Sequence, residues 1–219
     1  EAKLSEEVDE TRQVAAEGGS PNGSTEARIE DQDRVGARDR RMETLRGYES
    51  RLFELLQFSY SSSFNVTDNV RLKTGKSSGM AFDAFLNPPV GSSWAQLAFD
   101  LAAFSSFVPS SAIFNRMIRM AVATRDFPTG KVYTGRQGKP RDAVSTGVLV
   151  LVVEIDDRYS PARLYQLAEQ IEFVNVVLRR PVGAVIVTNE RYANLTSEDL
   201  RDAISAVWSS VSGNVVVLG

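Results

Sequence analysis

The sequence predicts an α/β domain built on a largely parallel sheet, and three observations support this prediction. Residues 147–156 read Gly-Val-Leu-Val-Leu-Val-Val-Glu-Ile-Asp, an apolar run rich in β-branched residues that is typical of a strand buried on both faces. From this run onward the pattern alternates strand, helix, strand, helix and strand, as in parallel sheets with right-handed crossovers. The chain has 219 residues with 42% hydrophobic content, which is enough for one sizeable core.

The composition limits the chemistry, because the sequence contains no histidine and no cysteine. Imidazole bases, Ser-His and Cys-His pairs, disulfides and thiolate metal sites are therefore excluded, and we expect a reducing, cytoplasmic location. No apolar run reaches about 18 residues, so we expect no membrane span. The chemistry that remains uses carboxylates, Lys, Ser, Thr or Tyr, together with a hard cation such as Mg²⁺.

Residues 1–41 are predicted to form a charged arm that is either helical or disordered. They hold 11 acidic and 7 basic side chains, and residues 18–25 form a linker of small and polar residues. We expect this arm to contact an upstream region or a partner protein, or to join copies in a homo-oligomer; a nucleic-acid-binding arm is the alternative. Because the chain opens on Glu1 without a leader sequence, we also expect it to derive from a longer or processed chain.

The folded domain is predicted to span residues 42–219, and it opens with an amphipathic helix. Two strands follow at 64–72 and 80–86, joined by a hairpin turn. A helical insertion is then predicted at about 90–145, with two helices separated by Pro109. The apolar stripe of the first of these helices consists of Trp94, Leu97, Leu101, Phe104 and Phe107.

The end of the insertion, residues 125–146, is a Gly-rich connection with an excess of bases. Such a loop suits the phosphate backbone of a nucleic acid, and an ordinary surface loop is the alternative. The candidate nucleic-acid-binding residues are Lys131, Arg136, Lys139 and Arg141.

After the central strand, Ser160-Pro161 predicts a helix start, with a capping hydroxyl followed by proline at the first helical position. A buried strand is predicted at 182–188. Thr196 opens the last helix with Asp199 three residues later, a variant of the capping box, and a short strand at 215–218 follows.

Acidic side chains stand next to or inside the predicted strands. Glu154 and Asp156 point to the same side at the end of the central strand, because strand side chains alternate with period two. Asp83 lies inside the apolar run Ala-Phe-Asp-Ala-Phe. These acids either flank solvated strand ends or bind a metal ion.

This order of helix, hairpin strands with an acid, strand ending in an acid, helix and strand resembles the restriction-endonuclease-like fold. The resemblance is to the PD-(D/E)xK nuclease superfamily, in its Mrr-like and Holliday-junction-resolvase-like group. Asp83 matches the metal-binding Asp of the second strand, and Glu154 matches the Glu of the E-x-K motif that ends the third strand. The run Gly47-Tyr48-Glu49 resembles the first-helix pattern of that group.

The resemblance implies a nuclease that acts on DNA, with Glu49, Asp83, Glu154 and Asp156 as ligands of one or two Mg²⁺ ions. Such ions polarise a phosphodiester and lower the pKa of a bound water, and a nearby cation stabilises the developing charge. The E-x-K lysine is replaced by Asp156, so we expect its role to fall to Lys76 on the hairpin, with Lys73, Lys139 and Arg141 as alternatives.

Two other interpretations remain open. The missing lysine favours a non-catalytic scaffold or oligomerisation module on the same fold. Residues 156–160 also resemble the metal motif of von Willebrand A-type domains, with Arg158 in place of the middle serine, which would place a ligand at the carboxyl end of the central strand.

Overall fold

The computed structural model describes residues 26–71, 81–89, 96–105, 110–126, 129–133, 140–143, 145–154, 161–178, 181–209 and 214–218. The chain divides into two compact units, residues 1–50 and residues 51–219, which are considered separately. No helix within the described ranges is long and apolar enough to cross a membrane.

The first described element is α2, Glu26–Tyr60, a continuous helix of 35 residues. It passes without a break through residue 41, where the arm was predicted to end. Its last ten residues belong to the second unit, in which Leu52 and Leu56 are fully buried one helical turn apart. Arg51 donates hydrogen bonds to the carbonyl oxygens of Tyr192 and Leu195, at 3.1 and 3.0 Å. These bonds tie this end of α2 to the chain around α5, Asn189–Ala193.

The second unit is built on a six-stranded mixed sheet, so the predicted α/β class is confirmed. The first three strands pair antiparallel, and the remaining pairs are parallel. The strands in sheet order are β1 (Asn65–Arg71), β2 (Ala81–Asn87), β3 (Gln96–Ser105), β6 (Ser145–Glu154), β7 (Gly183–Thr188) and β8 (Val215–Leu218). A separate hairpin is formed by β4 (Thr129–Tyr133) and β5 (Pro140–Ala143).

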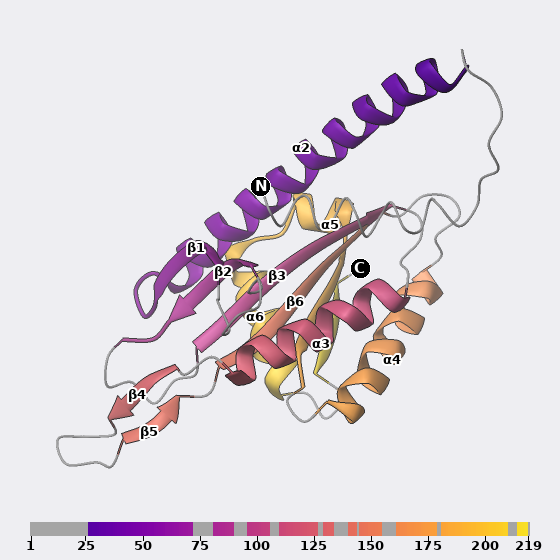
Figure 1. The fold of residues 1–219 in the computed structure, drawn as a ribbon. Helices are drawn as coiled ribbons and strands as arrows, with labels where there is room; N and C mark the ends of the chain where they lie inside the picture. Colours follow the sequence, from indigo (N-terminus) through magenta and orange to yellow (C-terminus); the bar gives the residue numbers. More distant parts are fainter. Residues whose placement is uncertain are drawn as a thin grey trace. The chain divides into compact units, whose positions relative to one another are not determined.

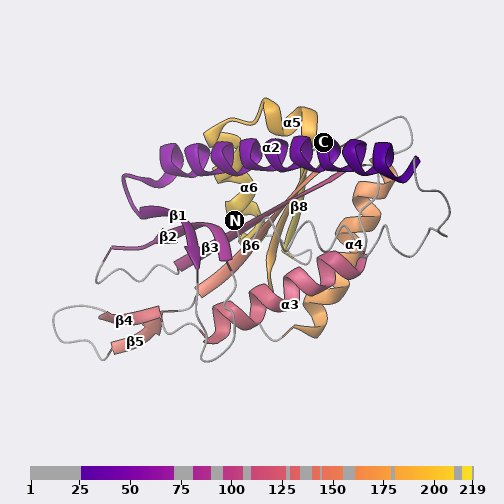
Figure 2. The ribbon, with the colours of Figure 1, turned by 45° about the horizontal axis from the view of Figure 1, so that its top comes forward.

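Helices flank the sheet on both faces (Figures 1 and 2). The helices α3, Ser110–Asp126, and α4, Pro161–Val177, pack against one face and share its core cluster with Leu149, Leu151 and Ile186. The other face carries α5 and α6, Ser197–Ser209. Along the chain, each of these flanking helices belongs to the connection between two strands that are neighbours in the sheet.

The connection from β7 to β8 differs in hand from the one before it. β6, β7 and β8 follow one another in one direction across the sheet, but α4 lies on one face and α6 on the other. Successive connections of the same hand would lie on the same face, so the two crossovers have opposite hands and the prediction of uniformly right-handed crossovers is wrong. The chain changes face directly after β7, where Thr188 caps α5 by accepting a hydrogen bond from the Arg191 amide at 3.1 Å.

The predicted helix across 94–107 is also wrong, since residues 96–105 form β3. This strand lies between β2 and β6 and pairs with both of them. The region 90–145 is therefore not a helical insertion, because it supplies a central strand of the sheet. Both faces of β3 carry buried apolar side chains: those of Ala98, Phe99, Leu101 and Ala102. The residues that suggested a helical stripe are therefore part of a longer run in which nearly every apolar side chain is buried.

The predicted capping box at the start of α6 is confirmed. The Thr196 hydroxyl accepts a hydrogen bond from the Asp199 amide at 3.1 Å, and the Asp199 carboxylate accepts from both the Thr196 hydroxyl and amide, at 2.7 and 3.1 Å. The pKa of Asp199 is held below its ordinary value of 3.8, most strongly by the hydrogen bond from the Thr196 hydroxyl and next by the one from the Thr196 amide. The positive charge of Arg191 also lowers this pKa.

An Asp199→Asn variant is expected to lose stability at neutral pH but not in strong acid. The pKa of Asp199 is lower in the folded than in the unfolded chain, so its contribution is present above pH 3.8 and is lost as the pH falls through the folded value. Thermal unfolding of both proteins between pH 7 and pH 2 measures this, and their melting temperatures should converge at the acid end. A constant difference down to pH 2 would contradict this role of the carboxylate.

Candidate functional site

Asp83 lies in the core of the sheet, on β2. It is only 5% exposed, and its carboxylate accepts a hydrogen bond from the backbone amide of Leu101 on β3 at 2.6 Å. In the antiparallel register of the two strands, Ala84, the residue next to Asp83, pairs with Phe99. The carboxylate of Asp83 therefore binds the backbone of the neighbouring strand, which satisfies part of the hydrogen-bonding demand of a buried acid.

A second acid, Asp100, lies one register step beyond the Ala84–Phe99 pair, opposite Asp83 on β3. It is completely buried, and Arg116 of α3 donates a hydrogen bond to its carboxylate at 2.9 Å. Arg116 itself is 5% exposed. Two negatively charged carboxylates on neighbouring strands would repel each other. The buried guanidinium of Arg116 offsets this repulsion with its positive charge.

Asp100 and Arg116 were missed in the sequence analysis. Asp100 could have been found as a charged residue inside an apolar run, which is how Asp83 was found. Because the apolar spacing predicted a helix across residues 94–107, Asp100 was not expected inside a sheet.

Glu154 lies at the end of β6, where it is exposed and pairs with Ser105 of β3. Ser105 is five residues beyond Asp100, and β3 lies between β2 and β6. With about 3.3 Å per residue along a strand and about 4.8 Å between strands, Asp83 and Glu154 are roughly 19 Å apart. Ligands of one Mg²⁺ bind at about 2.1 Å, so the two acids do not hold a common ion as the sequence predicted.

The other predicted ligands and bases are divided among the first unit, the β4–β5 hairpin and residues outside the described ranges. Glu49 is partly buried on α2 and belongs to the first unit. Asp156 and Lys76 fall outside the described residues, as do Arg136 and Lys139. Within the described ranges, no three acidic side chains come together in a way that could hold a metal ion.

Lys131 and Arg141 are brought to the same structural element, the β4–β5 hairpin. Lys131 pairs with Asp142, and Arg141 pairs with Val132, in its antiparallel register. The predicted basic connection therefore contains a two-stranded ribbon in place of a structureless loop.

A feature that the sequence analysis did not single out is the apolar outer surface of α3 and α4. Phe173, Val176 and Val177 of α4 are 73%, 84% and 70% exposed, and Tyr165 is 64% exposed. On α3, Phe114 and Val122 are also exposed. A helix that is apolar on its core face and on its outer face is typical of a helix that another surface covers.

Comparisons of this chain with protein families, with curated proteins and with solved structures found no match.

Proposed function

We propose that this protein is a nuclease-derived, non-catalytic subunit that binds other protein chains through a restriction-endonuclease-like body. One observation carries the proposal: the two facing acids of the sheet, Asp83 and Asp100, are buried and engaged by Leu101 and Arg116. An arrangement of this kind holds α3 on the sheet, and it presents no open carboxylates to a substrate.

The order of elements supports the nuclease kinship. Helix α2, strands β1, β2 and β3 and helix α3 follow one another as in the fold that the sequence resembles, and β6 comes after the β4–β5 hairpin. In that resemblance the E-x-K motif belongs to the third strand, which is β3, so its acid corresponds to Asp100 and no longer to Glu154. The triplet is then Asp100-Leu101-Ala102, with Ala102 in the place of the lysine.

The surroundings of these acids do not favour catalysis. Mg²⁺ in such sites keeps several waters and also binds the phosphate of the substrate, so its carboxylate ligands need solvent access. Asp100 is 0% exposed and Asp83 is 5% exposed. The guanidinium of Arg116, at 2.9 Å from Asp100 Oδ2, also engages one of the two carboxylate oxygens and places a positive charge where a cation would bind. The buried acids therefore act in packing, and the exposed apolar side chains of α3 and α4 provide the surface for binding.

A plasmid-cleavage assay tests the non-catalytic assignment. The wild-type protein is expected to leave supercoiled DNA intact in Mg²⁺ and in Mn²⁺, as are the Asp83→Asn and Asp100→Asn variants. Circular dichroism of each protein verifies that it is folded. Cleavage by the wild type that a folded Asp83→Asn or Asp100→Asn variant loses, but Glu154→Gln keeps, would contradict the proposal and restore a catalytic role to the buried acids.

A further inference from the structure

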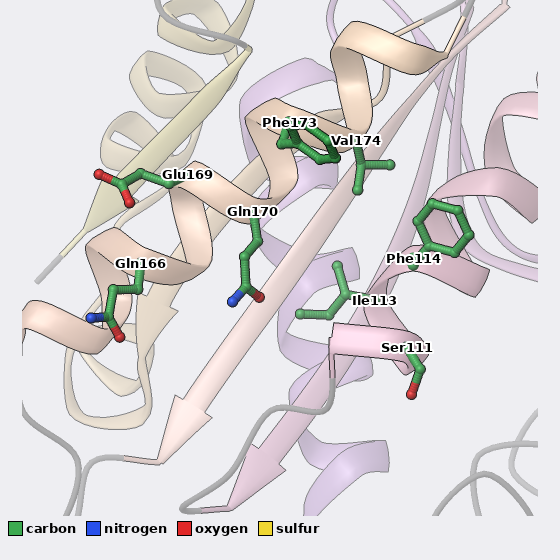
Figure 3. A pocket seen from close by; sticks show the side chains of 8 residues that line it. All are labelled: Ser111, Ile113, Phe114, Gln166, Glu169, Gln170, Phe173 and Val174. Carbon is green, nitrogen blue, oxygen red and sulfur yellow. The ribbon is translucent and has the colours of Figure 1, made fainter.

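The outer surface of α3 and α4 contains a groove between the two helices. Its volume is about 670 Å³, and Figure 3 shows that its walls come from both helices. Lining residues include Ile113 and Phe114 of α3, and Gln166, Gln170, Phe173 and Val174 of α4. The groove is open to solvent along helices that both pack on the same face of the sheet.

The apolar side chains beside the groove repeat at the spacing of one helical turn. Phe114, Ile118 and Val122 follow one another at intervals of four along α3, and Phe173 and Val177 do so along α4. Each helix therefore has an apolar edge that includes a groove-lining phenylalanine, in addition to the side that it buries against the sheet. Two such edges with a groove between them suit packing by further helices.

The exposed apolar area of this surface is about three quarters of the area that each partner of a standard interface buries. Phe114, Val122, Phe173 and Val177, together with Tyr165 and Val176, expose on the order of 600 Å² of side chain, if a whole aromatic side chain presents roughly 200 Å². The largest apolar patch on an ordinary monomer is about 300–600 Å², and each partner of a standard interface buries about 800 Å².

The charge pattern favours a second copy as the partner. Among residues of α3 and α4 whose side chains the structure describes, Glu169 is the one exposed charged residue, and it lines the groove; Arg119 and Glu172 are partly buried. The centres of protein interfaces are depleted of charge in this way, and two identical copies of this surface meet with little repulsion. A two-fold axis across the surface would let Phe173 of each copy enter the groove of the other, which makes the contact reciprocal.

We propose, as an inference that rests on the proposed function, that two copies of this chain associate through the α3–α4 surface. Their four helices form a layer between two sheets, with Phe173 and Val177 at its centre. Substituting glutamate for either residue buries a charge without a partner and removes an apolar anchor. Losses of this kind exceed about 2 kcal/mol at the centre of an interface, which weakens the dimer at least about 30-fold.

Sedimentation equilibrium of the full chain over a range of concentrations tests this interface. The wild type is expected to be a dimer, and Phe173→Glu and Val177→Glu are each expected to shift it to monomer. Phe58→Glu is the matched control, because Phe58 is 84% exposed on the end of α2 that is hydrogen-bonded to the opposite helical layer. It should leave the dimer intact. All these side chains are exposed, so thermal unfolding of the monomeric variants should remain cooperative.

Three outcomes would overturn the interface: a wild type that is monomeric at every concentration, a dimer that neither α4 substitution weakens, or equal weakening by Phe58→Glu. The plasmid assay does not depend on mass, so the two proposals fail separately. A monomer that does not cut DNA removes this interface alone, whereas a dimer that cuts DNA removes the non-catalytic assignment.

Discussion

An Arg116→Leu variant is expected to be less stable than the wild type by about 3–5 kcal/mol in free energy of unfolding. The substitution leaves the carboxylate of Asp100 completely buried without its guanidinium, which lies 2.9 Å away in the wild type. Burying a charge without a partner in an apolar core lowers the free energy of unfolding by more than the ion pair had contributed to it. Urea unfolding measures the change, and the melting temperature should fall by on the order of 10 °C.

The double variant Asp100→Leu/Arg116→Leu separates this explanation from simple loss of packing. When both charges are absent, Asp83 is the buried carboxylate that remains there, and it keeps its hydrogen bond from the Leu101 amide, so most of the lost stability should return. Arg201→Leu is the matched control, because Arg201 is exposed and its ion pair with Glu198 is long, at 3.7 Å. It should change stability by less than about 0.5 kcal/mol. A double variant as unstable as Arg116→Leu would show that the buried charges are not the source of the effect.

The strands that could be predicted from the sequence are those with a clear boundary. β1 and β2 were predicted at 64–72 and 80–86, and they lie within one residue of those limits because a turn-rich segment separates two strand-like segments. The final strand, Val215–Leu218, has the predicted limits. β6 was predicted from its uniformly apolar run. Its glycine also has a packing role: a Cβ at Gly147 would lie 2.3 Å from the side chain of Met120, so glycine lets α3 pack closely.

β3 could not be predicted because its sequence is apolar at nearly every position. In such a run the residues spaced by three and four are as apolar as those spaced by two, so helix and buried strand have the same signature. The neighbours decide the structure: β3 pairs with β2 on one side and β6 on the other, and those pairings join residues far apart in the chain. Local sequence patterns contain no information about such long-range partners.

The candidate site shows the same limit. The sequence analysis correctly selected Asp83 as an acid inside a strand, but the acid opposite it depended on the strand order. Once β3 is placed between β2 and β6, Asp83 faces Asp100, and Glu154 lies far along the sheet. Arg116 comes from a helix that was correctly predicted, yet its position over β3 follows only from the three-dimensional packing.

An Asn175→Ala variant is expected to lose about 2–4 kcal/mol of stability, the second large effect that the structure predicts. Asn175 is a polar residue on the buried side of α4, and its side chain makes two hydrogen bonds to the backbone of Val182. Its amide group donates to the Val182 carbonyl at 2.8 Å, and its oxygen accepts from the Val182 amide at 3.0 Å. Both backbone groups are buried just before β7, so alanine would leave a donor and an acceptor unsatisfied.

Asn115→Ala provides the control for Asn175→Ala, since it makes the same chemical change at an exposed position of α3. Alanine has the higher helix propensity, so both variants gain the same small stabilisation from the backbone, and Asn115→Ala should be neutral or slightly more stable. The difference between the two variants in urea unfolding then reports what the buried side chain of Asn175 contributes, including its two hydrogen bonds to Val182. Because these bonds fix where the chain enters β7, hydrogen exchange of the β7 amides should accelerate in Asn175→Ala. Equal stability of the two variants would mean that the contact with Val182 does not anchor α4 to the sheet.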